Sequence, residues 1–140
     1  MQVRDIMNKN VIVGKKDLTI KEASEVMAKL RIGCLVITEG KKIVGIITST
    51  DILRSIANDK KPEATLIEDI MSKKVLTIHP EKNIEDAVDM MMKRKIKKLP
   101  VVSENKIIGI VTASDIIVVE PKMISTIASL LSIKTPYAGG

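Results

Sequence analysis

The segment G-I-I-T-S-T-D-I-L, residues 45–53, ends an aliphatic run with three hydroxyl side chains and a carboxylate, and G-I-V-T-A-S-D-I-I repeats the pattern at residues 109–117. Where a strand ends and a helix begins, backbone N–H groups are free and hydroxyls add further donors, which suits phosphate binding. A carboxylate there would repel phosphate, but it can accept hydrogen bonds from neutral hydroxyl groups. The residue types therefore predict a site for a ligand that carries phosphate and hydroxyl groups.

A purely structural alternative explains the same residues. Thr50 would cap the following helix and Asp51 would interact favourably with its positive end, each contributing about 1 kcal/mol. Capping is expected whether or not a ligand binds. Ligand binding is an additional hypothesis that depends on the repetition and on a family resemblance given below.

The chain contains two copies of one unit. With a shift of 64 residues, residues 3–56 align with residues 67–120 without a gap and match at 18 of 54 positions. Both copies begin with the triplet D-I-M, at residues 5–7 and 69–71. We predict repeat one over residues 3–58, a linker over 59–66, repeat two over 67–120, and a C-terminal helix and tail over 121–140.

Hydrophobic periodicity predicts the same order of elements in both copies, β-α-β-β-α. In the first copy, Thr19 and Glu22 form a capping-box pattern before a helix that extends to about residue 31. The sequence predicts a mixed α/β (α+β) fold in which the two repeats pack as a pseudo-twofold pair with two related clefts. The predicted elements are strands at 11–13, 34–38, 42–47, 75–77, 98–102 and 107–111, and helices at 19–31, 50–58, 83–95 and from about 114.

This arrangement resembles a tandem pair of CBS domains, the modules named after cystathionine beta-synthase. The resemblance depends on the element order, the paired G-h-h-T-x-x-D motifs (h, aliphatic), the L-P-V-V at 99–102 and the leading D-I-M, and it extends to about residue 120. It implies a regulatory module without catalytic activity that binds AMP, ADP, ATP or S-adenosylmethionine between the repeats and dimerises into a disk. In the family, the motif carboxylate bridges the two ribose hydroxyls.

The resemblance also implies two nucleotide sites, each combining residues of both copies. The first would contain Val13, Gly14, Thr48, Thr50 and Asp51 with Lys97 and Lys98. The second would contain Thr77, Ile78, Thr112, Ser114 and Asp115 with Gly33 and Cys34. The first site is basic and the second is neutral, and Val36 stands where the other copy has Pro100. We therefore expect phosphorylated ligands to bind more tightly at the first site.

Other reactive or charged residues have simpler interpretations. Lys93, Arg94 and Lys95 close a helix and are expected to be solvated. His79 and Cys34 are the only candidates for a nucleophile and its base, but the sequence offers no third residue to orient them, and His79-Pro80 is typical of a turn. We expect no enzyme activity, no cofactor and no metal site.

Composition narrows the function classes. Phe and Trp are absent and there is one Tyr, which argues against single-strand nucleic-acid binding through base stacking, although the net charge of +6 keeps nucleic-acid binding as the alternative function. A structural module with vestigial sites is a weaker third possibility. No segment has the pattern of a signal peptide or a membrane span, so we expect a soluble, cytoplasmic protein.

The segment after residue 121 departs from the repeat. Apolar residues at 123, 124, 127, 130 and 131 form an amphipathic stripe, which would cover either the module's own surface or a dimer contact. The predicted partners are an adenine nucleotide, a second copy in a homodimer and an unidentified effector protein. No effector domain is expected on this chain, which predicts a stand-alone module.

Overall fold

In the computed structural model, which describes residues 1–131, the chain divides into two compact units. The first-repeat unit comprises residues 12–76 and 104–107. The second-repeat unit comprises residues 1–11, 77–103 and, within the described part, 108–131. The C-terminal tail predicted beyond the last helix lies outside the described residues.

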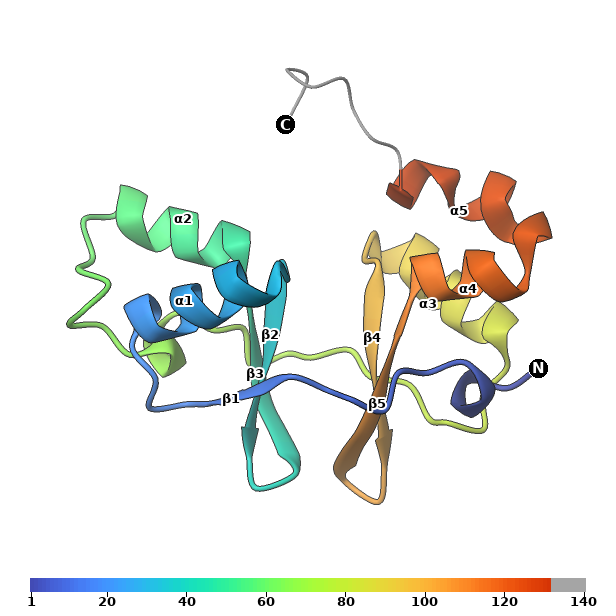
Figure 1. The fold of residues 1–140 in the computed structure, drawn as a ribbon, viewed down its shortest axis with the longest axis horizontal. Helices are drawn as coiled ribbons and strands as arrows, with labels where there is room; N and C mark the ends of the chain where they lie inside the picture. The colour runs from blue at the N-terminus through green and yellow to red at the C-terminus, as the bar shows by residue number, and fades with distance from the viewer. Residues whose placement is uncertain (132–140) are drawn as a thin grey trace. The chain divides into compact units, whose positions relative to one another are not determined.

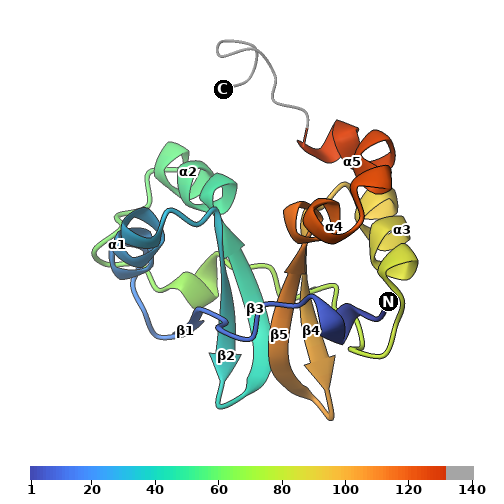
Figure 2. The same ribbon diagram turned by 45° about the vertical axis from the view of Figure 1, so that its right-hand side comes forward.

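The first-repeat unit has a three-stranded sheet with two helices side by side on one of its faces (Figures 1 and 2). Strand β1 pairs in parallel with β2, which pairs antiparallel with β3 so that Cys34 lies opposite Thr48. The elements are β1 (Val13–Lys15), α1 (Ile20–Leu30), β2 (Cys34–Glu39), β3 (Lys42–Thr48), α2 (Ser49–Ala57) and the 3₁₀ turn η2 (Ile67–Asp69).

Helix α1 forms as its sequence pattern predicts. The Thr19 hydroxyl accepts a hydrogen bond from the Glu22 amide at 3.1 Å, and the Glu22 carboxylate accepts one from the Thr19 amide at 3.0 Å. Hydrogen bonding to Thr19 lowers the pKa of Glu22. The bond to the Thr19 backbone has the larger effect and the bond to its side chain the smaller one. The apolar face of α1 then packs on the sheet, and the core consists of Ile20, Ala23, Met27, Leu35, Ile37, Ile47 and Ile67.

The second-repeat unit has a two-stranded sheet, with α3, α4 and α5 gathered on one side of it (Figures 1 and 2). Its elements are the 3₁₀ turn η1 (Val3–Asp5), α3 (Ile84–Arg94), β4 (Lys98–Ser103), β5 (Lys106–Thr112, of which residues 108–112 belong to this unit), α4 (Ala113–Val119), the 3₁₀ turn η3 (Pro121–Met123) and α5 (Ile124–Leu131). None of the described helices combines the length and the apolar character that a membrane span requires.

The first strand of each copy differs from its prediction. In the first copy β1 begins at Val13 rather than at residue 11, and Ile12 and Val13 are both exposed. In the second copy the strand predicted over 75–77 is absent as a regular strand. Only Ile78 forms a parallel bridge, to Val101. The next bond of the ladder toward residues 75–77 would be donated by the amide of residue 100, and Pro100 has no amide hydrogen.

The leading segment of each repeat packs in the unit that contains the other repeat's helices and hairpin. Asn8 exchanges two backbone hydrogen bonds with Ile110, at 2.8 and 2.9 Å. Ser72 exchanges two with Ile46, both at 2.9 Å. Neither repeat therefore supplies all the residues of one compact unit.

The methionine of each D-I-M triplet lies against a glycine of the G-h-h-T-x-x-D motif. A Cβ atom added to Gly109 would lie 2.6 Å from Met7 Sδ and 3.2 Å from the backbone oxygen of Asn8. In the other unit, a Cβ atom on Gly45 would overlap Met71, with Cγ at 2.9 Å. Each motif glycine therefore makes room for the methionine side chain, a role that was not predicted from the sequence.

The C-terminal amphipathic helix is present and covers its own unit. Helix α5 packs against both α3 and α4 and buries Ile127 completely. The apolar stripe over 123–131 therefore covers the module's own surface, which was one of the two roles predicted for it.

We predict that Gly109→Ala lowers the free energy of unfolding by about 1–3 kcal/mol, because the added methyl group overpacks the Met7 contact next to a fixed backbone oxygen. Denaturant unfolding monitored by circular dichroism measures the change. The double variant Met7→Ala with Gly109→Ala should lose less stability than the sum of its single changes, because Met7→Ala removes the overlap.

Gly33→Ala is the matched control for this prediction. A Cβ atom at Gly33 would meet only Ser49 Oγ, at an ordinary contact distance of 3.8 Å. We expect this variant to change the free energy of unfolding by no more than about 0.5 kcal/mol. Equal losses in Gly109→Ala and Gly33→Ala would contradict the assigned role of Met7.

Candidate ligand-binding segments

Both T-x-x-D motifs form capping boxes at the start of a helix. In the first copy, Thr48 Oγ1 accepts a hydrogen bond from the Asp51 amide at 3.2 Å, and Asp51 Oδ2 accepts one from the Thr48 amide at 2.9 Å. The second copy has the same pair between Thr112 and Asp115, with both distances 3.1 Å. The helix cap is therefore Thr48, and the prediction that Thr50 caps α2 is wrong, because β3 leads directly into a helix that begins at Ser49.

Most of the backbone donors at these helix starts already have partners. The Ser49 amide donates to the Gly33 oxygen at 3.0 Å, and the Ala113 amide donates to the Lys97 oxygen at 2.9 Å. The amide of the third residue of each helix donates to the capping threonine. Among the described residues, the amide of the second residue, Thr50 in α2 and Ser114 in α4, is therefore left without a partner. The sequence predicted several free amides at each helix start, and the structure leaves one in each copy.

The side chains of Thr50 and Ser114 are both exposed, and no hydrogen bond to either hydroxyl is formed within the described part of the chain. Each of these residues therefore presents a hydroxyl and a backbone amide next to one another. A phosphate oxygen or a sugar hydroxyl could bind to this pair of groups.

The two motif carboxylates differ in their second oxygen. Asp51 Oδ1 lies 3.4 Å from Arg54, whereas Val118 occupies the position of Arg54 in the second copy and is 79% exposed. Asp115 therefore forms no salt bridge among residues 1–131. The difference is visible in the sequence, because the shift of 64 residues aligns Arg54 with Val118, but it was not among the predicted features of the sites.

The strand residues assigned to the sites have different environments. Val13 is 43% exposed and can contact a ligand with its side chain. Gly14 is buried, and a Cβ atom on it would lie 2.8 Å from Leu35, so its lack of a side chain serves packing. Thr77 is half-buried, and Ile78 is buried at 4% exposure with its amide donating to the Pro100 oxygen at 3.0 Å.

The residues before the second strand of each copy lie beside the motif of their own copy. Gly33 accepts from both the amide and the hydroxyl of Ser49, and Cys34 is paired with Thr48. Lys97 accepts from Ala113, with its side chain exposed, and Lys98 begins β4 with its side chain half-buried. Whether these residues complete the site of the other copy, as the family resemblance implies, stays a prediction.

The candidate reactive residues have structural roles in their own units. His79 Nδ1 accepts a hydrogen bond from the Glu81 amide at 3.2 Å, as expected for a turn. Cys34 is a free, half-buried cysteine at the start of β2. Within the described residues, no group of three His, Cys, Asp or Glu side chains is arranged to hold a metal ion.

A sequence profile of the CBS domain matches this chain twice, over residues 3–58 and 67–121. The chain belongs to the CBS domain family. Among solved structures, it is similar to the CBS domain pair of protein MJ0100, crystallised in complex with 5-methylthioadenosine and S-adenosyl-L-methionine. The identity is 36%, the TM-score is 0.75, and the alignment covers 85% of this chain and 98% of that one.

Other relatives of this CBS protein are also known. It is 25% identical to a putative acetoin utilization protein from Vibrio cholerae, with a TM-score of 0.79, over 92% of this chain and 96% of that one. It is 35% identical to an uncharacterized protein of Methanopyrus kandleri over 91% of this chain and 66% of that protein. It is 37% identical to the L-aspartate semialdehyde sulfurtransferase of Methanocaldococcus jannaschii over 81% of this chain but only 22% of the enzyme.

We predict that Thr48→Val lowers the free energy of unfolding by about 0.5–2 kcal/mol, because valine keeps the shape of threonine but removes the oxygen that caps α2. Thr50→Val is the matched control and should change stability by no more than about 0.5 kcal/mol, because the Thr50 hydroxyl has no partner among the described residues. Denaturant unfolding compares the two. A larger loss in Thr50→Val than in Thr48→Val would overturn the assignment of the cap.

Proposed function

We propose that this protein is a regulatory module that binds adenosine-containing ligands through its two T-x-x-D segments. The observation that carries the proposal is the similarity to the CBS domain pair of MJ0100, at 36% identity and over 98% of that chain, which was crystallised with 5-methylthioadenosine and S-adenosyl-L-methionine. The exposed hydroxyl and free amide of Thr50 and of Ser114 support the proposal, because they offer polar contacts that the fold itself does not use.

The proposed roles of the motif residues follow from their remaining hydrogen-bonding capacity. Asp51 and Asp115 each use Oδ2 in a capping box, which leaves Oδ1 to accept from ribose hydroxyls. Arg54 competes for that oxygen in the first copy only. Val13 and Gly14 in the first copy, and Thr77 and Ile78 in the second, would contact the adenine base. Cys34 would lie beside the ligand.

Lys97 and Lys98 are proposed to contact phosphate. Lys97 uses its backbone oxygen to hold the start of α4, and its exposed ammonium group forms no salt bridge among the described residues. The proposed ligands are therefore AMP, ADP or ATP in addition to S-adenosylmethionine and methylthioadenosine. We also propose that ligand binding is communicated to a second copy in a homodimer or to an effector protein. No observation favours the nucleic-acid alternative.

Isothermal titration calorimetry at fixed salt, with adenosine, methylthioadenosine, S-adenosylmethionine, AMP, ADP and ATP, tests the proposal. We expect at least one of these ligands to bind and to raise the melting temperature, because a ligand that binds only the folded state stabilises it. Absence of both heat and a melting shift for the whole panel would refute the proposed function.

We predict that the double variant Lys97→Gln, Lys98→Gln weakens AMP or ATP binding at least about tenfold and leaves adenosine binding unchanged, because charge-assisted hydrogen bonds to phosphate are lost. The control variant Lys93→Gln, Arg94→Gln removes the same charge from the last turn of α3 and should bind normally. Equal weakening in both variants would indicate a general charge effect, and a matching loss of adenosine binding would contradict phosphate contact.

A further inference from the structure

The two T-x-x-D segments differ in charge at one position close to the motif carboxylate. Arg54 lies three residues after Asp51, and its guanidinium approaches Asp51 Oδ1 to 3.4 Å. The shift of 64 residues places Val118 at the same position after Asp115. Between residues 48–55 and residues 112–119, this is the only position at which the two copies differ in charge.

The side chains at this position face water in both copies. The Arg54 side chain is 65% exposed and Val118 is 79% exposed, whereas the Asp51 side chain is only 19% exposed. An ion pair with such an exposed partner contributes little to folding, because water and salt screen it. Arg54 can therefore rearrange around a ligand at Asp51 without disturbing the core of the unit.

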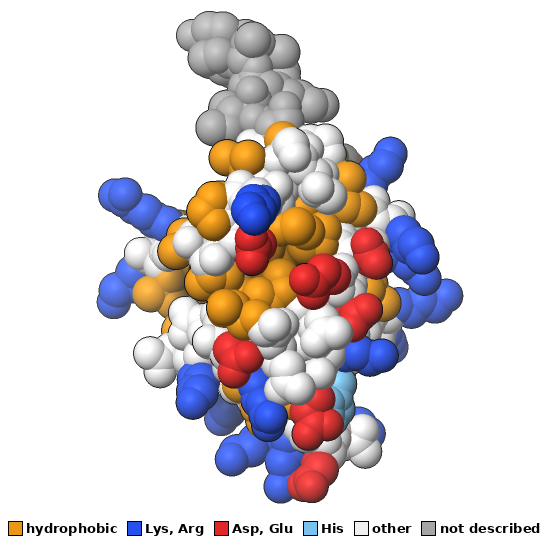
Figure 3. Space-filling model, turned by 90° about the vertical axis from the view of Figure 1, so that its right-hand side faces the viewer, with side chains coloured by type: hydrophobic (Ala, Val, Ile, Leu, Met, Phe, Trp, Pro, Cys, Tyr) orange, Lys and Arg blue, Asp and Glu red, His pale blue; other side chains and the backbone are white. Residues whose placement is uncertain are grey.

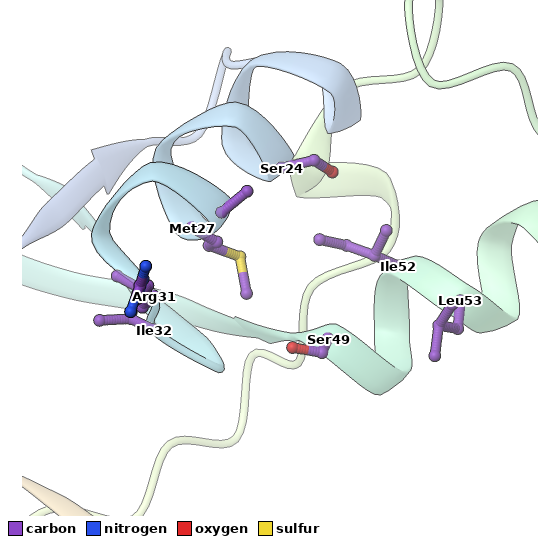
Figure 4. Close-up of a pocket in the computed structure, with 8 residues that line it drawn as sticks. Ser24, Met27, Arg31, Ile32, Ser49, Ile52 and Leu53 are labelled. Atoms are coloured by element: carbon purple, nitrogen blue, oxygen red, sulfur yellow. The ribbon is translucent and has the colours of Figure 1, made fainter. Parts of the chain in front are cut away.

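Arg54 lies on the opposite side of α2 from the pocket between α1 and α2. Ile52 projects into that pocket towards Met27 of α1 (Figure 4). Successive residues of a helix are rotated by about 100°, so Arg54 emerges almost opposite Ile52. Arg31 is the charged residue of the pocket lining, and it corresponds to Lys95 in the second copy. This pair therefore does not distinguish the two copies in charge.

A different charge environment surrounds Val118. Asp115 forms no salt bridge within residues 1–131. Helix α4 contains Asp115 and no basic residue. Acidic side chains lie among the hydrophobic ones on the helical face of this unit (Figure 3). The carboxylate of the second motif thus has no guanidinium beside it, in contrast to that of the first.

The ligands proposed above share a ribose and differ in the charge attached to it. The 5′ group is a neutral thioether in methylthioadenosine, a positively charged sulfonium in S-adenosylmethionine and an anionic phosphate in AMP. Because the 5′ carbon is bonded to the ribose ring, a ribose bound to Asp51 Oδ1 brings this group close to Arg54. Every ligand of the panel competes with Arg54 for the same oxygen, so only the 5′ charge separates them.

We propose that residue 54 in the first copy, and residue 118 in the second, select adenosine-containing ligands by the charge of their 5′ group. The Arg54 guanidinium attracts the phosphate of AMP and repels the sulfonium of S-adenosylmethionine, and Val118 does neither. Two charges several ångströms apart near a protein surface change a dissociation constant by about tenfold. The inference rests on the proposed function and adds a specificity-determining residue to each segment.

Two reciprocal variants test this selection without silencing either copy. Arg54→Val gives both copies valine at this position, and Val118→Arg gives both copies arginine. In calorimetry at low salt, we expect Val118→Arg to bind AMP about tenfold more tightly than Arg54→Val, and S-adenosylmethionine about tenfold more weakly. Methylthioadenosine should bind both variants equally, because its 5′ group is neutral. Lys97 and Lys98 are present in both variants, so their contribution cancels.

Arg54→Lys and Lys60→Gln are the control variants. Arg54→Lys keeps the positive charge and should keep the parent's ratio of AMP affinity to S-adenosylmethionine affinity. Lys60→Gln removes one positive charge from the exposed segment after α2 and should also keep that ratio. Added salt should reduce the difference between the reciprocal variants, because it screens charges exposed to water. All the substituted side chains are exposed, so the circular dichroism spectra should match that of the parent.

Equal changes for all three ligands would contradict the proposal, because they would show that residue 54 acts on the shared ribose. An unchanged affinity ratio, or the same change in Lys60→Gln, would contradict it too, as would binding of neutral ligands alone. Where the parent binds only one of the charged ligands, its affinity for the two reciprocal variants decides. Absence of binding across the whole panel would refute the proposed function as well, whereas binding with an unchanged ratio refutes only the selection by charge.

Discussion

The contact between methionine and glycine in each unit constrains much of this fold. Met7 and Met71 each occupy the space that a side chain on Gly109 or Gly45 would need. The methionine precedes the first strand of one repeat, and the glycine lies in the hairpin of the other. Because the contact joins residues of different repeats inside one compact unit, a single repeat cannot bury its own hairpin in this way. Each repeat therefore depends on the other to complete its compact unit.

The same contact holds the strand that leads to each candidate ligand-binding segment. Gly45 and Gly109 lie three residues before Thr48 and Thr112, which cap α2 and α4. The methionine packs against the strand that ends at the capping threonine. In the capping box, one oxygen of the aspartate carboxylate accepts a hydrogen bond from the backbone amide of that threonine. The T-x-x-D pattern has a complete structural explanation, so its repetition alone does not indicate a ligand. Ligand binding is supported instead by the polar groups that the capping boxes leave free and by the similarity to a CBS pair crystallised with adenosine-containing ligands.

The sequence predicted features that depend on local periodicity and missed those that depend on which segments meet. The Thr19 and Glu22 capping box, both hairpins and the C-terminal amphipathic helix formed as expected, because each is encoded by neighbouring residues. The strand predicted over 75–77 failed because its pairing depends on β4, where Pro100 lacks the amide hydrogen that the ladder would need. The packing of Met7 and Met71 against Gly109 and Gly45 was not predicted, because each methionine is distant in the sequence from the glycine that it contacts.

The two copies diverge where their helices have different surroundings. Ser24 and Ser49 in the first copy correspond to Val88 and Ala113 in the second, where α5 packs on the helices that carry them. Polar residues are tolerated where water reaches the helices, and aliphatic residues are favoured where another helix excludes it. In α2, Thr50 and Asp51 directly precede Ile52 and Leu53, which line the pocket between α1 and α2. A ligand that repositions the first turn of α2 would therefore also move the lining of this pocket.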